Sequence, residues 1–202
     1  MSSFSFDLVR IGNRAKGLEP GVVRPEEVEY ARKLLRERSG DIYAALYVVG
    51  LCGGKDDAPL IEQYLYGSEN NVYVEVSLKA LCRYLGLIDN YRGLVRELIF
   101  NPPDETGFRR MAAIHLADKY FENFQDDELG CELVRILCDL EDPHRSSTRD
   151  ALVAILGLSH ELNDPHGLSF DERDDDATLI LKRACERFHC PTVQFVDPRN
   201  RH

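Results

Sequence analysis

The chain has 202 residues, enough for one domain or two small ones, and its 44% of apolar residues excludes a disordered chain. The formal net charge of −10 disfavours nucleic acid as a partner, because phosphate contacts call for a basic surface. No apolar run approaches the roughly 20 residues that span a bilayer. The start MSSFSFDLVRIG also lacks a secretory pattern, so we expect a cytoplasmic protein.

The first predicted helix begins at Pro25, because proline suits the first helical position and the two glutamates after it complement the helix dipole. We expect Ser39 and Gly40 to end this helix. Further helices follow from apolar residues spaced three and four apart, separated by polar turns. The nine predicted helices cover 25–38, 42–52, 57–66, 72–87, 91–99, 105–121, 127–139, 146–158 and 175–188. The only stretch that allows a strand is TVQFV (192–196).

One short phrase recurs along these helices. It reads AALYVVGL at 44–51, ALCRYLGL at 80–87 and ALVAILGL at 151–158, with a looser copy, AAIHLADK, at 112–119. The first alanines of successive copies lie 36, 32 and 39 residues apart. Such periods are typical of stacked helical repeats, in which neighbouring units bury each other's apolar faces.

A second apolar phrase follows each copy, after an entry rich in Asp and Asn that suits a helix N-cap. These phrases are LIEQYL (60–65), LVRELI (94–99), LVRILC (133–138) and LILKRAC (179–185). Each unit is therefore predicted to be a pair of helices joined by a polar turn. A bundle of amphipathic helices with chance Ala/Leu phrases is the alternative.

These phrases resemble the HEAT-like repeats, including the short type first described in phycobilin lyases. The resemblance covers roughly 25–188, which we take as the repeat domain, with 1–24 as an N-terminal extension and 189–202 as a C-terminal tail. It implies an all-α fold, a right-handed α-solenoid of about four to five helix pairs whose second helices line a concave surface.

The recurring alanines set a register for that concave surface. Residues just before and three after each core alanine are expected to point away from the core, and tyrosine and arginine there are typical binding anchors. The candidate partner-binding residues at these positions are Tyr43, Tyr47, Lys79, Arg83, Met111, His115 and Asp150, with Glu75 added one turn before Lys79 and Lys119 one turn after His115. The alternative is a solvated helix face without a partner.

A second candidate surface is the connection 161–176, ELNDPHGLSFDERDDD, which carries seven acids against one base. Long connections in compact domains are either functional or disordered. We assign Asp171, Glu172, Asp174 and Asp175 to partner binding, since such a loop would attract a basic protein. A flexible solvated insertion is the competing interpretation.

The six cysteines form no CxxC pair, and most lie in apolar helical segments, so we expect them to be reduced. Cys185, His189 and Cys190 would bind a metal only with a fourth ligand from elsewhere, and a helix end is the simpler explanation. His160–Glu161 is a single His-Glu pair, whereas HEAT-like di-iron enzymes carry several. The sequence shows no nucleotide-binding or nucleophile motif.

The sequence therefore predicts a non-enzymatic binding protein without cofactor or metal, which sequesters or scaffolds one basic protein partner. Small acidic HEAT-like proteins of this kind resemble bacterial immunity proteins, which clamp a toxin's effector domain; an assembly client is the other candidate partner. The alternative is a HEAT-like enzyme or enzyme subunit, resembling a bilin lyase or a DNA-repair glycosylase. Neither a membrane nor nucleic acid is an expected partner.

Overall fold

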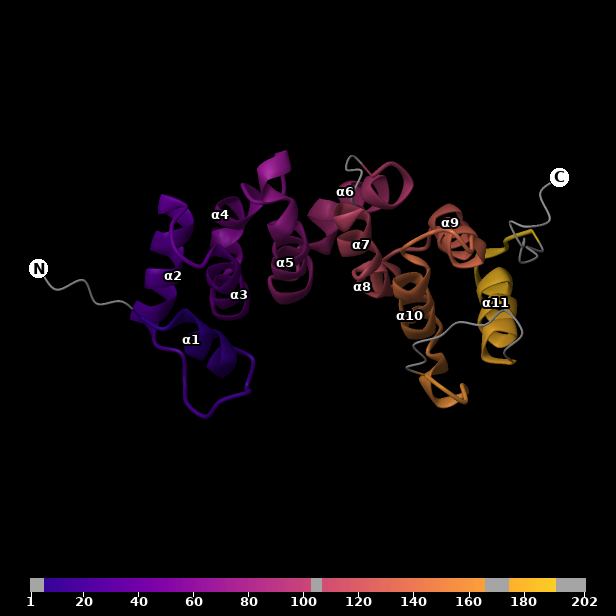
Figure 1. Cartoon of the computed structure of the whole chain (residues 1–202), viewed down its shortest axis with the longest axis horizontal. Coiled ribbons are helices and arrows are strands. Elements are labelled where there is room, and N and C mark those ends of the chain that lie inside the picture. Colours follow the sequence, from indigo (N-terminus) through magenta and orange to yellow (C-terminus); the bar gives the residue numbers. More distant parts are fainter. Residues whose placement is uncertain (1–5, 103–106, 166–174, 192–202) are drawn as a thin grey trace, which may run out of the picture. The chain divides into compact units, whose positions relative to one another are not determined.

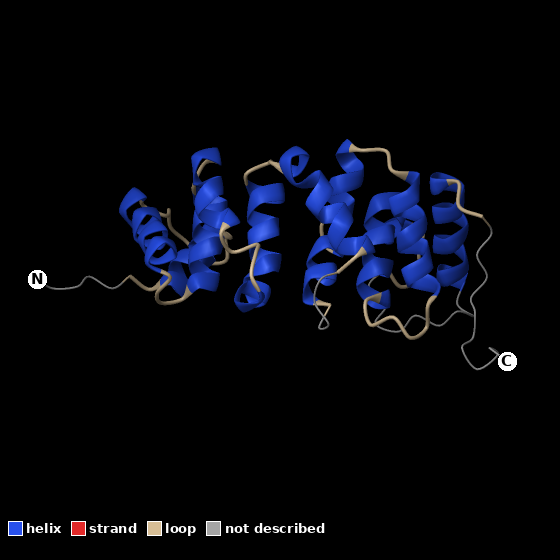
Figure 2. Ribbon diagram, turned by 90° about the horizontal axis from the view of Figure 1, so that it is seen from above, coloured by secondary structure: helices blue, strands red, loops and turns tan. Residues whose placement is uncertain are grey.

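The computed structural model describes residues 6–102, 107–165 and 175–191. It is all-helical in these residues, with eleven α-helices, 72% helix and no strand (Figure 2). The chain divides into two compact units, Met1–Tyr91 and Arg92–His202. The repeat pattern does not indicate this division, which falls inside helix α6 (Ile88–Phe100). The all-helical prediction is confirmed, whereas the right-handed solenoid stays a prediction.

The N-terminal unit is built around helix α3. It contains α1 (Leu8–Ala15), α2 (Pro25–Glu37), α3 (Ile42–Cys52), α4 (Ala58–Glu62) and α5 (Val74–Lys79), which are labelled in Figure 1. A π-helical turn, Ala80–Tyr84, follows α5 directly and is called the π-turn below. α3 contacts α1, α2, α5 and the π-turn. Its position at the centre explains why most of its residues are apolar: Leu46, Val48 and Val49 are fully buried.

Charged side chains fix the helix ends of this unit. α2 begins at Pro25, as predicted, and the Glu27 carboxylate accepts the Arg24 N–H at 2.9 Å. The Glu27 carboxylate also forms an ion pair with the guanidinium of Arg14 in α1, with an N–O distance of 2.6 Å, and this pair connects α1 to α2. The predicted extension 1–24 thus contains a packed helix that the repeat pattern does not reveal. Its apolar residues Leu8 and Ile11 are buried.

The C-terminal unit is built around α9. It contains the rest of α6, then α7 (Phe108–Ile114), α8 (Ala117–Asn123), α9 (Asp127–Cys138), α10 (Arg145–Leu156) and α11 (Asp175–Phe188). α9 contacts both α10 and α11, and its residues Leu133, Val134 and Ile136 are fully buried. Asp126 caps α9, because its carboxylate accepts the Leu129 N–H at 3.0 Å.

Two sequence predictions need correction here. The single helix expected at 105–121 is two helices, because the chain tightens between them and the Leu116 N–H bonds to the Ala113 carbonyl at 3.0 Å. The alanine register is correct at Ala80, Ala112 and Ala151, which are buried, but in the first copy the buried residue is Ala45 and Ala44 is half-buried. The expected segment 192–196 lies outside the described residues.

Candidate functional site

The N-terminal unit gathers three tyrosines on one face. Tyr43 and Tyr47 lie one turn apart on α3, with ring centroids separated by 5.3 Å in an edge-on contact. The Tyr84 ring lies 6.4 Å from the Tyr47 ring. Tyr43 is exposed and the other two are half-buried, so the group belongs to the surface and not to the core.

Two lysines complete this group. The ammonium of Lys16 lies 3.8 Å from the centroid of the Tyr47 ring, and that of Lys79 lies 6.0 Å from it. A cation over an aromatic face is attracted by the ring's quadrupole, so both lysines hold the ring in place. We call Tyr43, Tyr47, Tyr84, Lys16 and Lys79 the tyrosine patch.

A close helix approach creates the patch. A Cβ on Gly50 would lie only 2.7 Å from the Ala80 Cβ and 3.2 Å from Cδ2 of Tyr84, so α3 and the π-turn meet where α3 has no side chain. The π-turn is marked by the Leu85 N–H bonding to the Ala80 carbonyl at 2.9 Å, five residues back. Both features bring Tyr84 beside Tyr47.

The Tyr47 hydroxyl of the patch stays protonated at neutral pH. Burial is the main cause that raises the pKa of Tyr47, and the neighbouring Tyr43 hydroxyl and the Glu75 carboxylate act in the same direction. Tyr47 is therefore a neutral hydrogen-bond donor, and its ring keeps the polarity that favours cations. Glu75 and Arg83, the remaining predicted residues of this unit, are half-buried.

The structure brings together three of the predicted residues, Tyr43, Tyr47 and Lys79. Sequence reasoning missed Lys16, because it lies in a segment to which no helix was assigned. Tyr84 was not a candidate, because the register of a regular α-helix selects Arg83, one turn after Lys79. The available signal was weak, since Tyr84 is the fifth residue of its copy of the phrase, whereas Tyr47 is the fourth residue of its own.

The predicted residues of the C-terminal unit lie on several helices. Met111 is half-buried on α7, His115 is exposed just after it, and Lys119 of α8 pairs with Glu122 at 2.5 Å. The break between α7 and α8 interrupts the one-turn spacing that the sequence implied for these three residues. Asp150 is exposed on α10, 3.6 Å from the Arg149 guanidinium.

The structure describes the two ends of the predicted acidic loop, 161–165 and 175–176. Asp175 is exposed at the start of α11, whereas Asp171, Glu172 and Asp174 lie outside the described residues. Asp176 is buried and accepts the N–H groups of Asp164 and Asn163 at 2.8 and 2.9 Å. These hydrogen bonds hold its pKa below the usual range, so this acid anchors the loop's start to α11.

The single His-Glu pair that was considered for metal chemistry lies at the surface. His160 and Glu161 are exposed, and Glu161 pairs with Arg183 at 3.3 Å. Within 6–102, 107–165 and 175–191, no three His, Cys, Asp or Glu side chains gather as metal ligands would. Among the helices described, none is long and apolar enough to cross a membrane.

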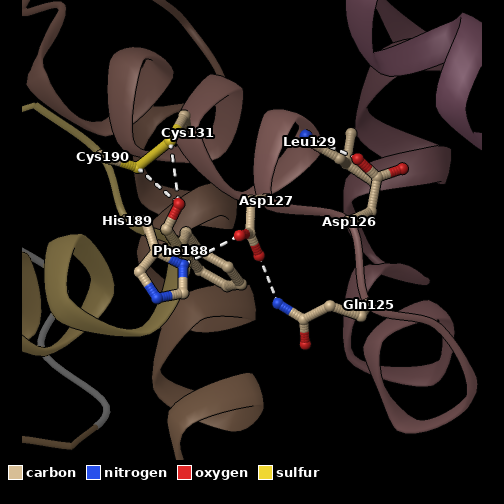
Figure 3. The surroundings of a disulfide bond; sticks show 8 residues. All are labelled: Gln125, Asp126, Asp127, Leu129, Cys131, Phe188, His189 and Cys190. Carbon is tan, nitrogen blue, oxygen red and sulfur yellow. Dashed lines mark hydrogen bonds and ion pairs between the residues drawn. A yellow bond between two sulfur atoms is a disulfide. The ribbon is translucent and has the colours of Figure 1, made fainter.

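One cysteine prediction is wrong. Cys131 of α9 and Cys190 beyond the end of α11 form a disulfide, although they are 59 residues apart in the sequence (Figure 3). The packing of α11 against α9 brings them together, and no spacing rule in the sequence announces it. The other four cysteines are free. Comparison of the chain with protein-family models, curated proteins and solved structures finds no significant match.

Proposed function

We propose that the chain is a non-enzymatic protein-binding protein that holds one basic protein partner. The observation that carries the proposal is the tyrosine patch, in which three aromatic rings gather at the surface of a unit that has a separate apolar core. Tyrosine is enriched at the energetic centres of protein interfaces, because it offers a large ring and a polar hydroxyl at a low entropic cost.

The patch supports a contact with cationic side chains. The Lys16 ammonium lies 3.8 Å from the centroid of the Tyr47 ring, so one ring of this group already takes part in a cation–π contact. Tyr43 is the most accessible of the three and lies at the edge of the group. A lysine or arginine of the partner would stack on Tyr43 in the way that Lys16 stacks on Tyr47.

The charge of the chain supports a basic partner as well. Residues 1–91 carry 11 basic and 13 acidic side chains, and residues 92–202 carry 14 and 22, so net charges of −2 and −8 make up the total of −10. The C-terminal unit therefore attracts a basic protein over distances comparable with the Debye length. Asp150 and Asp175 are exposed acids of this unit.

The finer identity follows from the sequence resemblance alone. We propose a HEAT-like α-solenoid in the cytoplasm, whose partner is a toxin effector domain or an assembly client. The immunity function rests on small size, acidity and helical repeats. It does not depend on any single residue of the patch.

The experiment is an affinity capture from the native cells with the purified chain as bait, at low and at high salt, followed by mass spectrometry. We expect one stoichiometric basic protein, retained at low salt and weakened at high salt because charges steer it. Tyr43→Ala is expected to reduce its retention, since an exposed anchor residue contributes to binding without supporting the core.

Tyr66→Ala is the matched control, because Tyr66 is an exposed tyrosine of the same unit that lies outside the patch. Both variants should keep the wild-type circular dichroism spectrum. Equal retention by Tyr43→Ala, Tyr66→Ala and wild type would contradict the role of the patch. Retention of nucleic acid instead of protein would contradict the proposal as a whole.

A further inference from the structure

Two segments of the C-terminal unit are joined by a disulfide, and noncovalent contacts around the disulfide join the same two segments. The link is the Cys131–Cys190 disulfide, which joins the first half of α9 to the residues that follow α11 (Figure 3). Both cysteine residues are half-buried, so the disulfide is not enclosed in the core of the unit.

The first noncovalent contact is a packed aromatic ring. Phe188, the last residue of α11, is fully buried. Its ring occupies the place that a side chain of Gly130 would take, since a Cβ there would lie 2.1 Å from Cγ of Phe188. Gly130 precedes Cys131 and Phe188 lies two residues before Cys190, so this contact sets the distance between the two cysteine backbones.

Two polar contacts fix the direction of the chain after Phe188. The Cys190 N–H bonds to the Cys185 carbonyl at 3.1 Å, while His189 takes a left-handed conformation with φ of 54°. This arrangement is a helix C-cap that turns Cys190 back toward α9. The His189 Nδ1 atom lies 2.8 Å from the Asp127 carboxylate at the start of α9 (Figure 3).

Three of the other cysteines in the described chain are poorly suited to exchange. Cys82 and Cys138 are buried, and burial raises the pKa of their thiols to about 12 and about 11. Burial also raises the pKa of Cys52, which lies in the N-terminal unit. Because the thiolate is the reacting form, these thiols are slow to attack a disulfide.

We propose that Cys131 and Cys190 form a reversible dithiol–disulfide site that a protein dithiol or glutathione opens and closes without unfolding the C-terminal unit. In the opening step a thiolate of the reductant attacks one sulfur atom, and the Cys131–Cys190 bond breaks to leave a mixed disulfide. The second thiol of a protein dithiol, or the thiol of a second glutathione molecule, then attacks that mixed disulfide. Two electrons and two protons have passed to Cys131 and Cys190, and the reductant leaves as a disulfide.

The proposed cytoplasmic location gives this site a use, although the site does not depend on the proposed function. Disulfides in the reducing cytoplasm are usually transient and respond to redox conditions. Opening this one would release the covalent tie between α9 and the residues after α11, while Phe188 and His189 keep the two thiols close for closing again. Oxidising conditions would thus form the disulfide, and reducing conditions would open it.

The experiment equilibrates the full-length protein in glutathione buffers of increasing reducing power, blocks free thiols by alkylation and maps the labels by mass spectrometry. We expect two additional labels to appear together, at Cys131 and Cys190, with an unchanged circular dichroism spectrum. After transfer to an excess of oxidised glutathione, which accepts the two electrons, closing should be first order in protein, with a rate constant that does not depend on protein concentration. Cys185→Ser, a cysteine of α11 outside the disulfide, is the matched control and should behave like wild type.

Three outcomes would overturn the proposal. The first is the absence of new labels until the protein is denatured, since the sulfur atoms would then be inaccessible. The second is loss of helicity together with reduction, because opening would then be unfolding. The third is reoxidation into intermolecular dimers or into pairs that include Cys138 or Cys185. Wild-type protein suffices for these measurements, so no variant has to fold.

Discussion

The substitution Gly50→Ala tests how the tyrosine patch is built. Alanine at this position would gain about 1 kcal/mol of helix propensity over glycine. Its Cβ, however, would lie 2.7 Å from the Ala80 Cβ and 3.2 Å from the Ala80 Cα, and neither atom can rotate away. Overpacking of this kind costs about 1–3 kcal/mol, and backbone contacts belong to the upper part of that range. The expected net loss is about 1–2 kcal/mol.

The assay is urea unfolding followed by circular dichroism. Gly12→Ala is the matched control in the same unit, because a Cβ on Gly12 of α1 meets no atom within 4 Å. That control should stabilise the protein by about 0.5–1 kcal/mol, as alanine does in a helix interior. If Gly50→Ala is as stable as Gly12→Ala, then α3 and the π-turn do not approach as described, and the explanation for the position of Tyr84 is wrong.

Three further predictions concern stability. Leu81→Ala should lower the unfolding free energy by about 2–5 kcal/mol in urea unfolding, because Leu81 is fully buried; a near-neutral result would refute the register of that helix. Cys190→Ser should lower it by about 4 kcal/mol under oxidising conditions, since the disulfide spans 59 residues, and no difference from wild type would refute the pairing. Hydrogen bonds from Arg32 hold the pKa of Asp57 below its usual 3.8. The ionised Asp57 carboxylate therefore stabilises the folded protein at pH values above 3.8, and this contribution is lost as the pH falls through the lower pKa of the folded state. The unfolding free energy should therefore fall less steeply with decreasing pH in Asp57→Asn than in wild type. Parallel curves of unfolding free energy against pH would contradict the Arg32–Asp57 pairing.

The sequence predicted what depends on spacing within one helix. Tyr43 and Tyr47 are four residues apart, so any α-helix there places them on one face. Most helices, the start of α2 and most of the buried alanines follow in the same way. Patterns of apolar residues carry this information because they record which side of a helix faces the core.

The remaining features depend on contacts between segments far apart in the chain. Tyr84 joins Tyr47 only because Gly50 lets the backbones approach, and a π-turn changes the register after Ala80. Lys16 reaches Tyr47 because α1 packs against α3. The disulfide likewise requires α11 to lie against α9. None of these approaches leaves a periodic trace in the sequence, so they need the three-dimensional structure.

The most direct test of the proposed function is native mass spectrometry of the protein purified from its own cells at low salt. Our account predicts a complex of the chain with one copy of a basic protein, which dissociates into its two components when the salt is raised. A chain that carries a metal ion or a chromophore and no protein would contradict the account. It would point instead to an enzyme or an enzyme subunit.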